Sequence, residues 1–147
     1  MMKREDSLKQ KLLSATDTTR VKVRFNDTDS MGVVHFKNYM VYFDDGFVSF
    51  MNSIKNKRNI EEMIHEGLAC GVKHVDITYE GSAIFGDYVI VKTRIKDIGN
   101  KSITFIHELS KESDNILLAK VEAVRFVLNL KANKLMSIMD FLEYYLK

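Results

Sequence analysis

The sequence contains no proline and no tryptophan, and only one cysteine and seven glycines among 147 residues. Without proline, every turn must be formed by Gly, Asn, Asp and Ser. The single Cys70 excludes an intramolecular disulfide, which favours a reducing compartment. Cys70 itself is interpreted as a small core residue, because no neighbouring feature of the sequence would activate its thiol.

The sequence also lacks a large net charge of either sign. The 22 Lys and Arg residues nearly balance the 20 Asp and Glu residues, and no long basic block occurs. This balance argues against a dedicated nucleic-acid-binding protein but permits binding of a small anion. No apolar run is long enough to span a bilayer, and residues 1–17 are too polar for a signal peptide. We therefore expect a cytoplasmic protein with neither nucleic-acid nor membrane partners.

The length predicts one globular domain. Residues 1–19 are interpreted as an N-terminal extension with a short helix over 5–14, and residues 20–147 as a single domain. A half-buried strand is expected over 20–25, where Val21, Val23 and Phe25 alternate with charged residues.

The most apolar segment, residues 38–54, repeats its large side chains at spacings of three and four, which predicts a buried helix. Four strands joined by short turns should follow it, over 70–80, 88–98, 102–110 and 116–130, and a closing helix over 137–146. Short turns pair consecutive strands antiparallel, and an apolar sheet face must be covered. The pattern predicts an α+β fold in which an antiparallel sheet wraps around a long central helix.

The loop before that helix carries two carboxylates, Asp27 and Asp29. A helix N-terminus offers unpaired N–H groups that can stabilise an oxyanion, and a nearby carboxylate can attack a carbonyl or activate water. Asp residues in such loops are also common turn formers and N-caps, so these features alone leave both interpretations open. A calcium loop is not expected, because Met31 and Asn38 stand where the EF-hand pattern requires ligands.

The same stretch resembles the signature of the 4-hydroxybenzoyl-CoA thioesterase family of hotdog proteins. The matching residues of the signature are Arg24-Phe25, Asp27-Thr28-Asp29, Gly32, Val33-Val34 and Asn38-Tyr39. Weaker matches follow at Asp44, at Ile77-Thr78-Tyr79 and at Ala83 with Phe85-Gly86-Asp87. The resemblance covers residues 20–130 in strand order and is most specific over 23–39.

The resemblance implies a hotdog-fold acyl-CoA thioesterase that releases a carboxylic acid and free CoA. It assigns the catalytic carboxylate to Asp29, as nucleophile or general base, and leaves Asp27 to order the loop. Gly32, Val34, His35 and Phe36 would bind the substrate, and backbone N–H groups near His35 and Phe36 would contact the oxyanion. No metal or redox cofactor is implied. The expected partners are acyl-CoA and further copies of the chain, as a homodimer or as a dimer of dimers (a homotetramer).

The sequence also departs from the family pattern. Phe36 lacks the polar side chain that the family often has, and Asp44-Asp45-Gly46-Phe47 replaces an acidic-Arg-Ala-Arg run, which leaves CoA or subunit contacts unassigned. A chemical role for His35 stays open, whereas His65, His74 and His107 are interpreted as structural or surface residues. Two alternatives remain: a hotdog acyl-CoA hydratase or dehydratase, and a non-catalytic acyl-CoA binding module. The acyl preference is not readable from the sequence.

Overall fold

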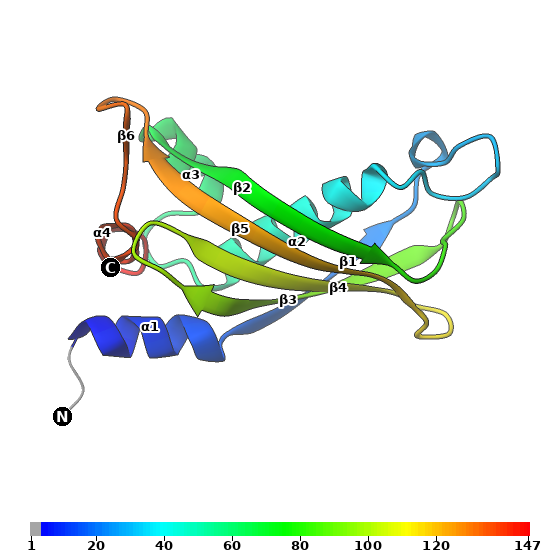
Figure 1. The fold of residues 1–147 in the computed structure, drawn as a ribbon, viewed down its shortest axis with the longest axis horizontal. Helices are drawn as coiled ribbons and strands as arrows, with labels where there is room; N and C mark the ends of the chain where they lie inside the picture. Colours follow the sequence, from blue (N-terminus) through cyan, green and yellow to red (C-terminus); the bar gives the residue numbers. More distant parts are fainter. Residues whose placement is uncertain (1–3) are drawn as a thin grey trace.

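The protein, seen in a computed structural model that describes residues 4–147, is a curled antiparallel sheet with one long helix in its concavity (Figure 1). The strands run in the order β1-β3-β4-β5-β2, and β6 pairs with β5. Their bounds are β1 Thr16–Lys22, β2 Leu68–Tyr79, β3 Tyr88–Ile98, β4 Ile103–Lys111, β5 Leu117–Asn129 and β6 Lys134–Leu135. The helices are α1 Arg4–Ser14, α2 Asn38–Ser53, α3 Ile60–His65 and α4 Ile138–Tyr145, with a short 3-10 helix η1 at Phe25–Asp27.

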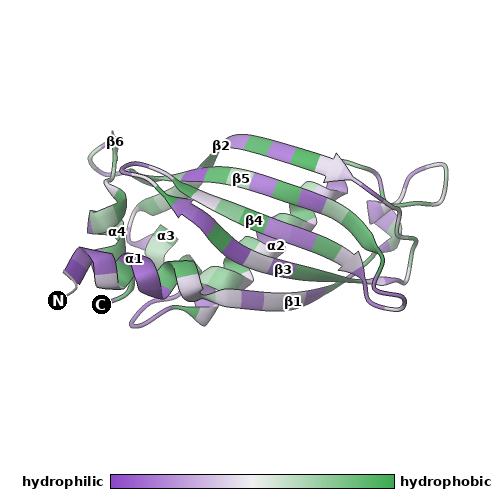
Figure 2. Ribbon diagram, turned by 60° about the horizontal axis from the view of Figure 1, so that its bottom comes forward, coloured by the Kyte–Doolittle hydropathy of each residue, from purple (hydrophilic) through white to green (hydrophobic). Residues whose placement is uncertain are grey.

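The central strands follow the alternation of their sequence. In β3 the buried residues are Val89, Val91, Thr93 and Ile95, which alternate along the strand. In β4 they include Ile103, Phe105, His107 and Leu109, which alternate in the same way. The strands in Figure 2 alternate hydrophobic and hydrophilic residues for the same reason, because successive side chains point to opposite faces of a sheet.

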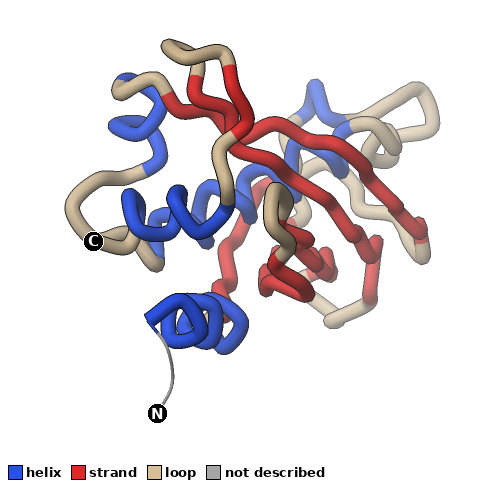
Figure 3. Tube along the Cα trace, turned by 60° about the vertical axis from the view of Figure 1, so that its left-hand side comes forward, coloured by secondary structure: helices blue, strands red, loops and turns tan. Residues whose placement is uncertain are grey.

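Helix α2 lies on the concave face of the sheet and packs mainly against β1 and β3 (Figure 3). Its buried side is aromatic, with Tyr39, Tyr42, Phe43, Phe47 and Phe50 all less than 7% exposed. The core around this helix divides into two clusters. One surrounds Tyr42 and Phe43 near the start of α2, and the other joins Phe47 and Phe50 to α1, α3 and α4.

The close approach of α2 to β3 depends on Gly46. A Cβ atom at this position would lie 2.5 Å from Cγ1 of Val91 and 2.9 Å from Oγ1 of Thr93. Val91 is fully buried and β-branched, so it cannot move aside cheaply. Gly46 has a low helix propensity, but the close packing of α2 on β3 requires a residue without a Cβ atom at this position.

We expect Gly46→Ala to destabilise the protein by about 1–2 kcal/mol, because overpacking at Val91 outweighs the gain of about 1 kcal/mol in helix propensity. Urea unfolding followed by far-UV circular dichroism measures the change. Val41→Ala, on the exposed side of the same helix, is the matched control and should shift stability by less than about 0.5 kcal/mol. A Gly46→Ala variant more stable than the wild type would contradict this packing argument.

The structure differs from the sequence-based prediction at the first strand. β1 begins at Thr16 and ends at Lys22, so it takes in part of the segment assigned to the extension. Its inward-facing Asp17 accepts a hydrogen bond of 2.6 Å from the Ser49 hydroxyl of α2, a polar contact that hydrophobic alternation cannot reveal. Phe25, expected on the buried face, lies beyond the strand in η1 and is 76% exposed.

The buried face of β5 is not the one with the largest apolar side chains. Val124, Phe126 and Leu128 alternate along β5 and share a face, but this is the outer face and is only half-buried. The concave face carries Ala123, Arg125 and Val127 instead. Both faces of β5 are apolar enough that the sequence pattern alone does not decide which one is buried.

Three helices close the end of the sheet opposite the 23–37 loop (Figure 1). Helix α1 packs Leu8 and Leu12 into the same cluster as Phe141 and Tyr145 of α4. Helix α3, which the sequence analysis did not identify, begins with an Asn59–Glu62 capping box. Among residues 4–147, no helix combines the length and apolarity needed to cross a bilayer.

Candidate active site

The signature segment forms a compact loop between β1 and α2. After η1, Thr28 and Val34 form an isolated antiparallel bridge, and the N–H of Asp29 donates to the carbonyl of Val33 at 2.9 Å. The turn closes at Gly32, whose φ of 80° is a left-handed conformation that favours glycine. A second bridge, between Val33 and Ile84, joins the loop to the segment that precedes β3. The loop is therefore held by backbone hydrogen bonds on two sides.

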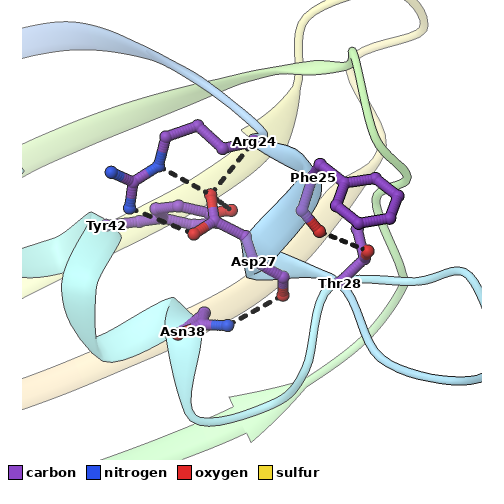
Figure 4. Close-up of polar contacts among 6 residues, drawn as sticks. All are labelled: Arg24, Phe25, Asp27, Thr28, Asn38 and Tyr42. Carbon is purple, nitrogen blue, oxygen red and sulfur yellow. Dashed lines mark hydrogen bonds and ion pairs between the residues drawn. The ribbon is translucent and has the colours of Figure 1, made fainter.

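Asp27 is the buried anchor of this loop (Figure 4). Its Oδ2 accepts hydrogen bonds from the Arg24 backbone N–H and the Tyr42 hydroxyl, both at 2.9 Å, and its Oδ1 accepts from Nη2 of Arg24 at 3.1 Å. Its carbonyl oxygen accepts from the His35 N–H at 2.9 Å and from Nδ2 of Asn38 at 2.8 Å. One residue thus ties the segment after β1, the loop and the first turns of α2 together.

The protonation state of Asp27 follows from these contacts. Burial acts to raise the pKa of its carboxyl, but hydrogen bonds from Arg24 and Tyr42 and the Arg24 charge outweigh burial and hold the pKa below its ordinary value of 3.8. Burial and the Asp27 carboxylate raise the pKa of the Tyr42 hydroxyl, which therefore keeps its proton and donates it. Asp27 is an ionised structural carboxylate whose lone pairs are already engaged.

Asp29 has a different environment. It is half-buried, and its Oδ1 accepts a hydrogen bond of 2.8 Å from the Met31 N–H, an Asx turn that orients the carboxylate. Within residues 4–147, its Oδ2 has no hydrogen-bond partner. Of the two carboxylates in the loop, only Asp29 has an oxygen free to meet another molecule.

The backbone N–H groups at the start of α2 are only partly available. The N–H of His35 is engaged by the Asp27 carbonyl, and the N–H of Lys37 donates to Nδ1 of His35 at 3.2 Å. Within the described chain, the N–H of Phe36 has no protein acceptor. Of the two backbone N–H groups expected to contact an oxyanion, that of Phe36 is free within the described chain. That of His35 is used in a hydrogen bond inside the loop.

The predicted substrate-binding residues all lie in the loop, but they differ in how far they are exposed to solvent. Phe36 is 62% exposed, and His35 is half-buried with its ring stacked on Phe36 at 4.6 Å between centroids. Gly32 is exposed at the turn. Val34 is buried, and its N–H donates to the carbonyl of Ala83 at 2.9 Å, so it packs the loop onto the core.

Three residues hold the loop in ways that the sequence analysis did not assign, although two of them, Arg24 and Tyr79, belong to the family matches. Tyr42 and Arg24 hold Asp27, and the Tyr79 hydroxyl at the end of β2 donates to the Phe36 carbonyl at 3.2 Å. Tyr42 stands four residues after Asn38, on the same helix face, and this spacing could have indicated it. Tyr79 lies far away in sequence, and the weaker family match at Ile77-Thr78-Tyr79 did not assign it to the loop.

Exposed apolar side chains surround this loop. Phe25 and Phe85 contact edge to face at 5.8 Å, and Phe36 and Tyr79 do so at 6.2 Å between ring centroids. Further large apolar residues of this rim that are more than 40% exposed are Met31, Met40 and Ile84. Exposed apolar side chains gathered around one loop favour a binding site for a ligand or a protein there. In residues 4–147, no group of three His, Cys, Asp or Glu side chains is placed to bind a metal ion.

Comparison with known proteins agrees with this description. Residues 23–146 match the family model of the thioesterase-like superfamily. The provisionally named acyl-CoA thioesterase YneP of Bacillus subtilis is 27% identical over 88 residues, which cover 59% of this chain and 62% of that protein. The match therefore spans less than two thirds of that relative's length.

Solved structures share the fold. A 1,4-dihydroxy-2-naphthoyl-CoA thioesterase from Synechocystis superposes with a TM-score of 0.75 at 23% identity, covering 84% of this chain and 90% of that one. A DHNA-CoA thioesterase from Staphylococcus aureus gives a TM-score of 0.78 at 18% identity, covering 86% and 83%. The α+β hotdog fold expected from the sequence is confirmed. The chain belongs to the thioesterase-like superfamily.

Proposed function

We propose that this protein hydrolyses an acyl-CoA thioester to a carboxylic acid and free CoA, with Asp29 as the catalytic carboxylate. The observation that carries the proposal is the contrast between the two loop carboxylates. Asp27 is buried and fully hydrogen-bonded, whereas Asp29 is oriented by Met31 and keeps one oxygen free. The family membership and the acyl-CoA thioesterase name of the Bacillus subtilis relative support the same activity.

In the proposed reaction, the thioester carbonyl lies beside the start of α2. Its oxygen accepts a hydrogen bond from the Phe36 N–H and is further stabilised by the positive end of the helix dipole. The Asp29 carboxylate either attacks the carbonyl carbon or removes a proton from a water that attacks it. The C–S bond then breaks and CoA leaves as a thiolate that takes up a proton. In the nucleophilic route, the acyl group remains on Asp29 as a mixed anhydride, and water hydrolyses it to release the carboxylic acid and restore the carboxylate. No metal takes part in this scheme.

A second copy of the chain is proposed to complete the site. β2 is an edge strand of twelve residues, and the sequence has no proline to block its free side. Long edge strands pair readily with another strand. Tyr79, at the end of β2, also belongs to the apolar rim of the loop, so an edge pairing would bring the partner close to Asp29. Light scattering should then give twice or four times the mass of one chain, and the mass of one chain would contradict the proposal.

The activity itself is tested by release of free CoA from acetyl-, hexanoyl-, palmitoyl-, benzoyl- and 4-hydroxybenzoyl-CoA. Turnover of at least one substrate supports the proposal, and the panel identifies the acyl class. Loss of absorbance with crotonyl-CoA, without CoA release, would indicate the hydratase alternative. Binding of acyl-CoA with neither reaction would indicate a binding module.

A further inference from the structure

The free N–H of Phe36 lies in the turn that precedes the regular part of α2. The peptide group that carries this N–H is held at its other end, where the His35 carbonyl accepts from the Asn38 N–H at 2.9 Å. The next peptide group is held less firmly, because the Phe36 carbonyl accepts from the Tyr39 N–H at 3.3 Å. The usual distance is about 2.9–3.0 Å. Support from outside the turn would therefore fix the direction of the Phe36 N–H more firmly.

That support comes from Tyr79, the last residue of β2. β2 ends at the same end of the sheet as the 23–37 loop (Figure 1). The Tyr79 hydroxyl donates to the Phe36 carbonyl at 3.2 Å, and is a second donor to that oxygen. A carbonyl oxygen has two lone pairs, so it can accept from Tyr39 and Tyr79 together. The hydroxyl thus joins the sheet to the turn at the residue whose N–H is free.

The Tyr79 ring rests on a buried side chain. Although Tyr79 is 41% exposed, its ring contacts the Tyr39 ring at 5.5 Å between centroids. Tyr39 is 2% exposed and belongs to the core cluster around Tyr42 and Phe43. Burial raises the pKa of the Tyr79 hydroxyl above its ordinary value of 10, so the hydroxyl keeps its proton and can donate at neutral pH. Tyr79 is therefore a donor held in place by the core.

We propose that Tyr79 is a positioning residue for thioester hydrolysis, whose hydroxyl keeps the Phe36 N–H directed at the oxygen of the thioester carbonyl. The inference rests on the proposed thioesterase function. Tyr79 acts through Phe36, since its hydroxyl proton is used in the bond to the Phe36 carbonyl. A donor to the oxyanion is most effective when it is already in place as the charge develops. Loss of the hydroxyl should therefore affect the transition state more than substrate binding.

The test compares Tyr79→Phe with the wild type in CoA release from the best substrate of the panel. Phenylalanine keeps the ring that packs on Tyr39 and removes only the hydroxyl. We expect kcat to fall about tenfold and KM to change less than about twofold, because a misdirected N–H stabilises the oxyanion less. A wild-type kcat in Tyr79→Phe would overturn the inference. A raised KM with unchanged kcat would overturn it too, since Tyr79 would then be a substrate-binding residue.

Tyr144→Phe is the matched control. The Tyr144 hydroxyl donates to Glu66 among the helices at the opposite end of the sheet, so this variant also loses one tyrosine hydrogen bond. It should keep the wild-type kcat and KM. Urea unfolding is measured on both variants. Each midpoint should shift by less than about 0.5 M, because both hydrogen bonds are exposed to solvent.

A second readout follows the Phe36 amide directly. In nitrogen-15 relaxation, the wild-type Phe36 N–H should have an order parameter of about 0.85, typical of rigid backbone, and Tyr79→Phe should lower it toward about 0.6. The amide of Phe47, in the middle of α2, should not change. Equal Phe36 order parameters in the two proteins would overturn the role of the Tyr79 hydroxyl.

The two proposals fail in different ways. A wild type that releases CoA, while Tyr79→Phe keeps both its kcat and its Phe36 order parameter, would refute this inference and leave the thioesterase function standing. A wild type that releases CoA from no substrate of the panel would refute the thioesterase function, and the positioning role of Tyr79 would fall with it.

Discussion

Replacing Asp29 with asparagine is expected to lower kcat by about a hundredfold or more, the loss typical of removing a catalytic acid or base. Asparagine keeps the shape of the side chain, and its Oδ1 can still accept the hydrogen bond from the Met31 N–H that forms the turn. It cannot act as a nucleophile or a base. The substitution therefore removes the chemistry of Asp29 while it keeps the geometry of the loop. CoA release from the best substrate of the panel measures the effect.

Stability is the necessary control for this experiment. The Asp29 carboxylate makes one hydrogen bond to the loop and no ion pair within the described residues, so Asp29→Asn should shift the free energy of unfolding by less than about 0.5 kcal/mol. Urea unfolding checks this on the same sample. An Asp29→Asn variant that keeps more than a tenth of the wild-type kcat would exclude Asp29 as the catalytic carboxylate.

Replacing Asp27 with asparagine is expected to lower the free energy of unfolding by about 1–3 kcal/mol at neutral pH. The two carboxylate oxygens accept hydrogen bonds from the Arg24 guanidinium and the Tyr42 hydroxyl. In asparagine an NH₂ group replaces one of these oxygens, so its N–H would face the N–H or O–H of Arg24 or Tyr42. The Arg24 contribution is discounted because its guanidinium is largely exposed. CoA release should fall as well. If the substitution shifts the loop, the Asp27 carbonyl no longer holds His35 and Asn38 in place at the start of α2.

The pH dependence of stability distinguishes this role from a general packing defect. The folded state holds the Asp27 carboxyl at a lower pKa than the unfolded chain, so the unfolded state binds the proton more tightly. The stabilisation is complete above the unfolded pKa of about 4 and is lost as pH falls through the depressed folded value. Asp27→Asn should therefore reduce the difference between stability at pH 6 and stability at pH 3. The same pH dependence in the variant and the wild type would contradict the assignment.

Tyr42→Phe gives a smaller, matched change in the same network. It removes one donor to Oδ2 of Asp27 and leaves the Arg24 contacts in place. Its expected cost is about 1 kcal/mol. Together, Tyr42→Phe and Asp27→Asn show how much of the free energy of unfolding comes from the Tyr42 hydroxyl and how much from the whole Asp27 carboxylate.

Most of the fold was predictable because its signals are local. The aromatic residues of α2 recur at helical spacing, and the observed helix, Asn38–Ser53, differs from the predicted one by one residue. The strand β3 coincides with its prediction, since its alternation is regular and its ends carry clear turn residues. The candidate loop was predictable for a similar reason, because its signature lies in one continuous stretch. The catalytic role of Asp29 stays a prediction that the assays must decide.

The spacing of residues along the chain determined the α+β class, the long buried helix and the loop with two carboxylates, and the hotdog fold was implied by the resemblance of residues 23–39 to the family signature. The tertiary structure decided which carboxylate is free, because the partners of Asp27 come from Arg24 before the loop and Tyr42 after it. It also decided that Gly46 must be small, that Arg125 faces the concave side of β5 and that Tyr79 reaches Phe36. These features depend on contacts between elements far apart in the chain. Spacing within a single element carries no information about such contacts.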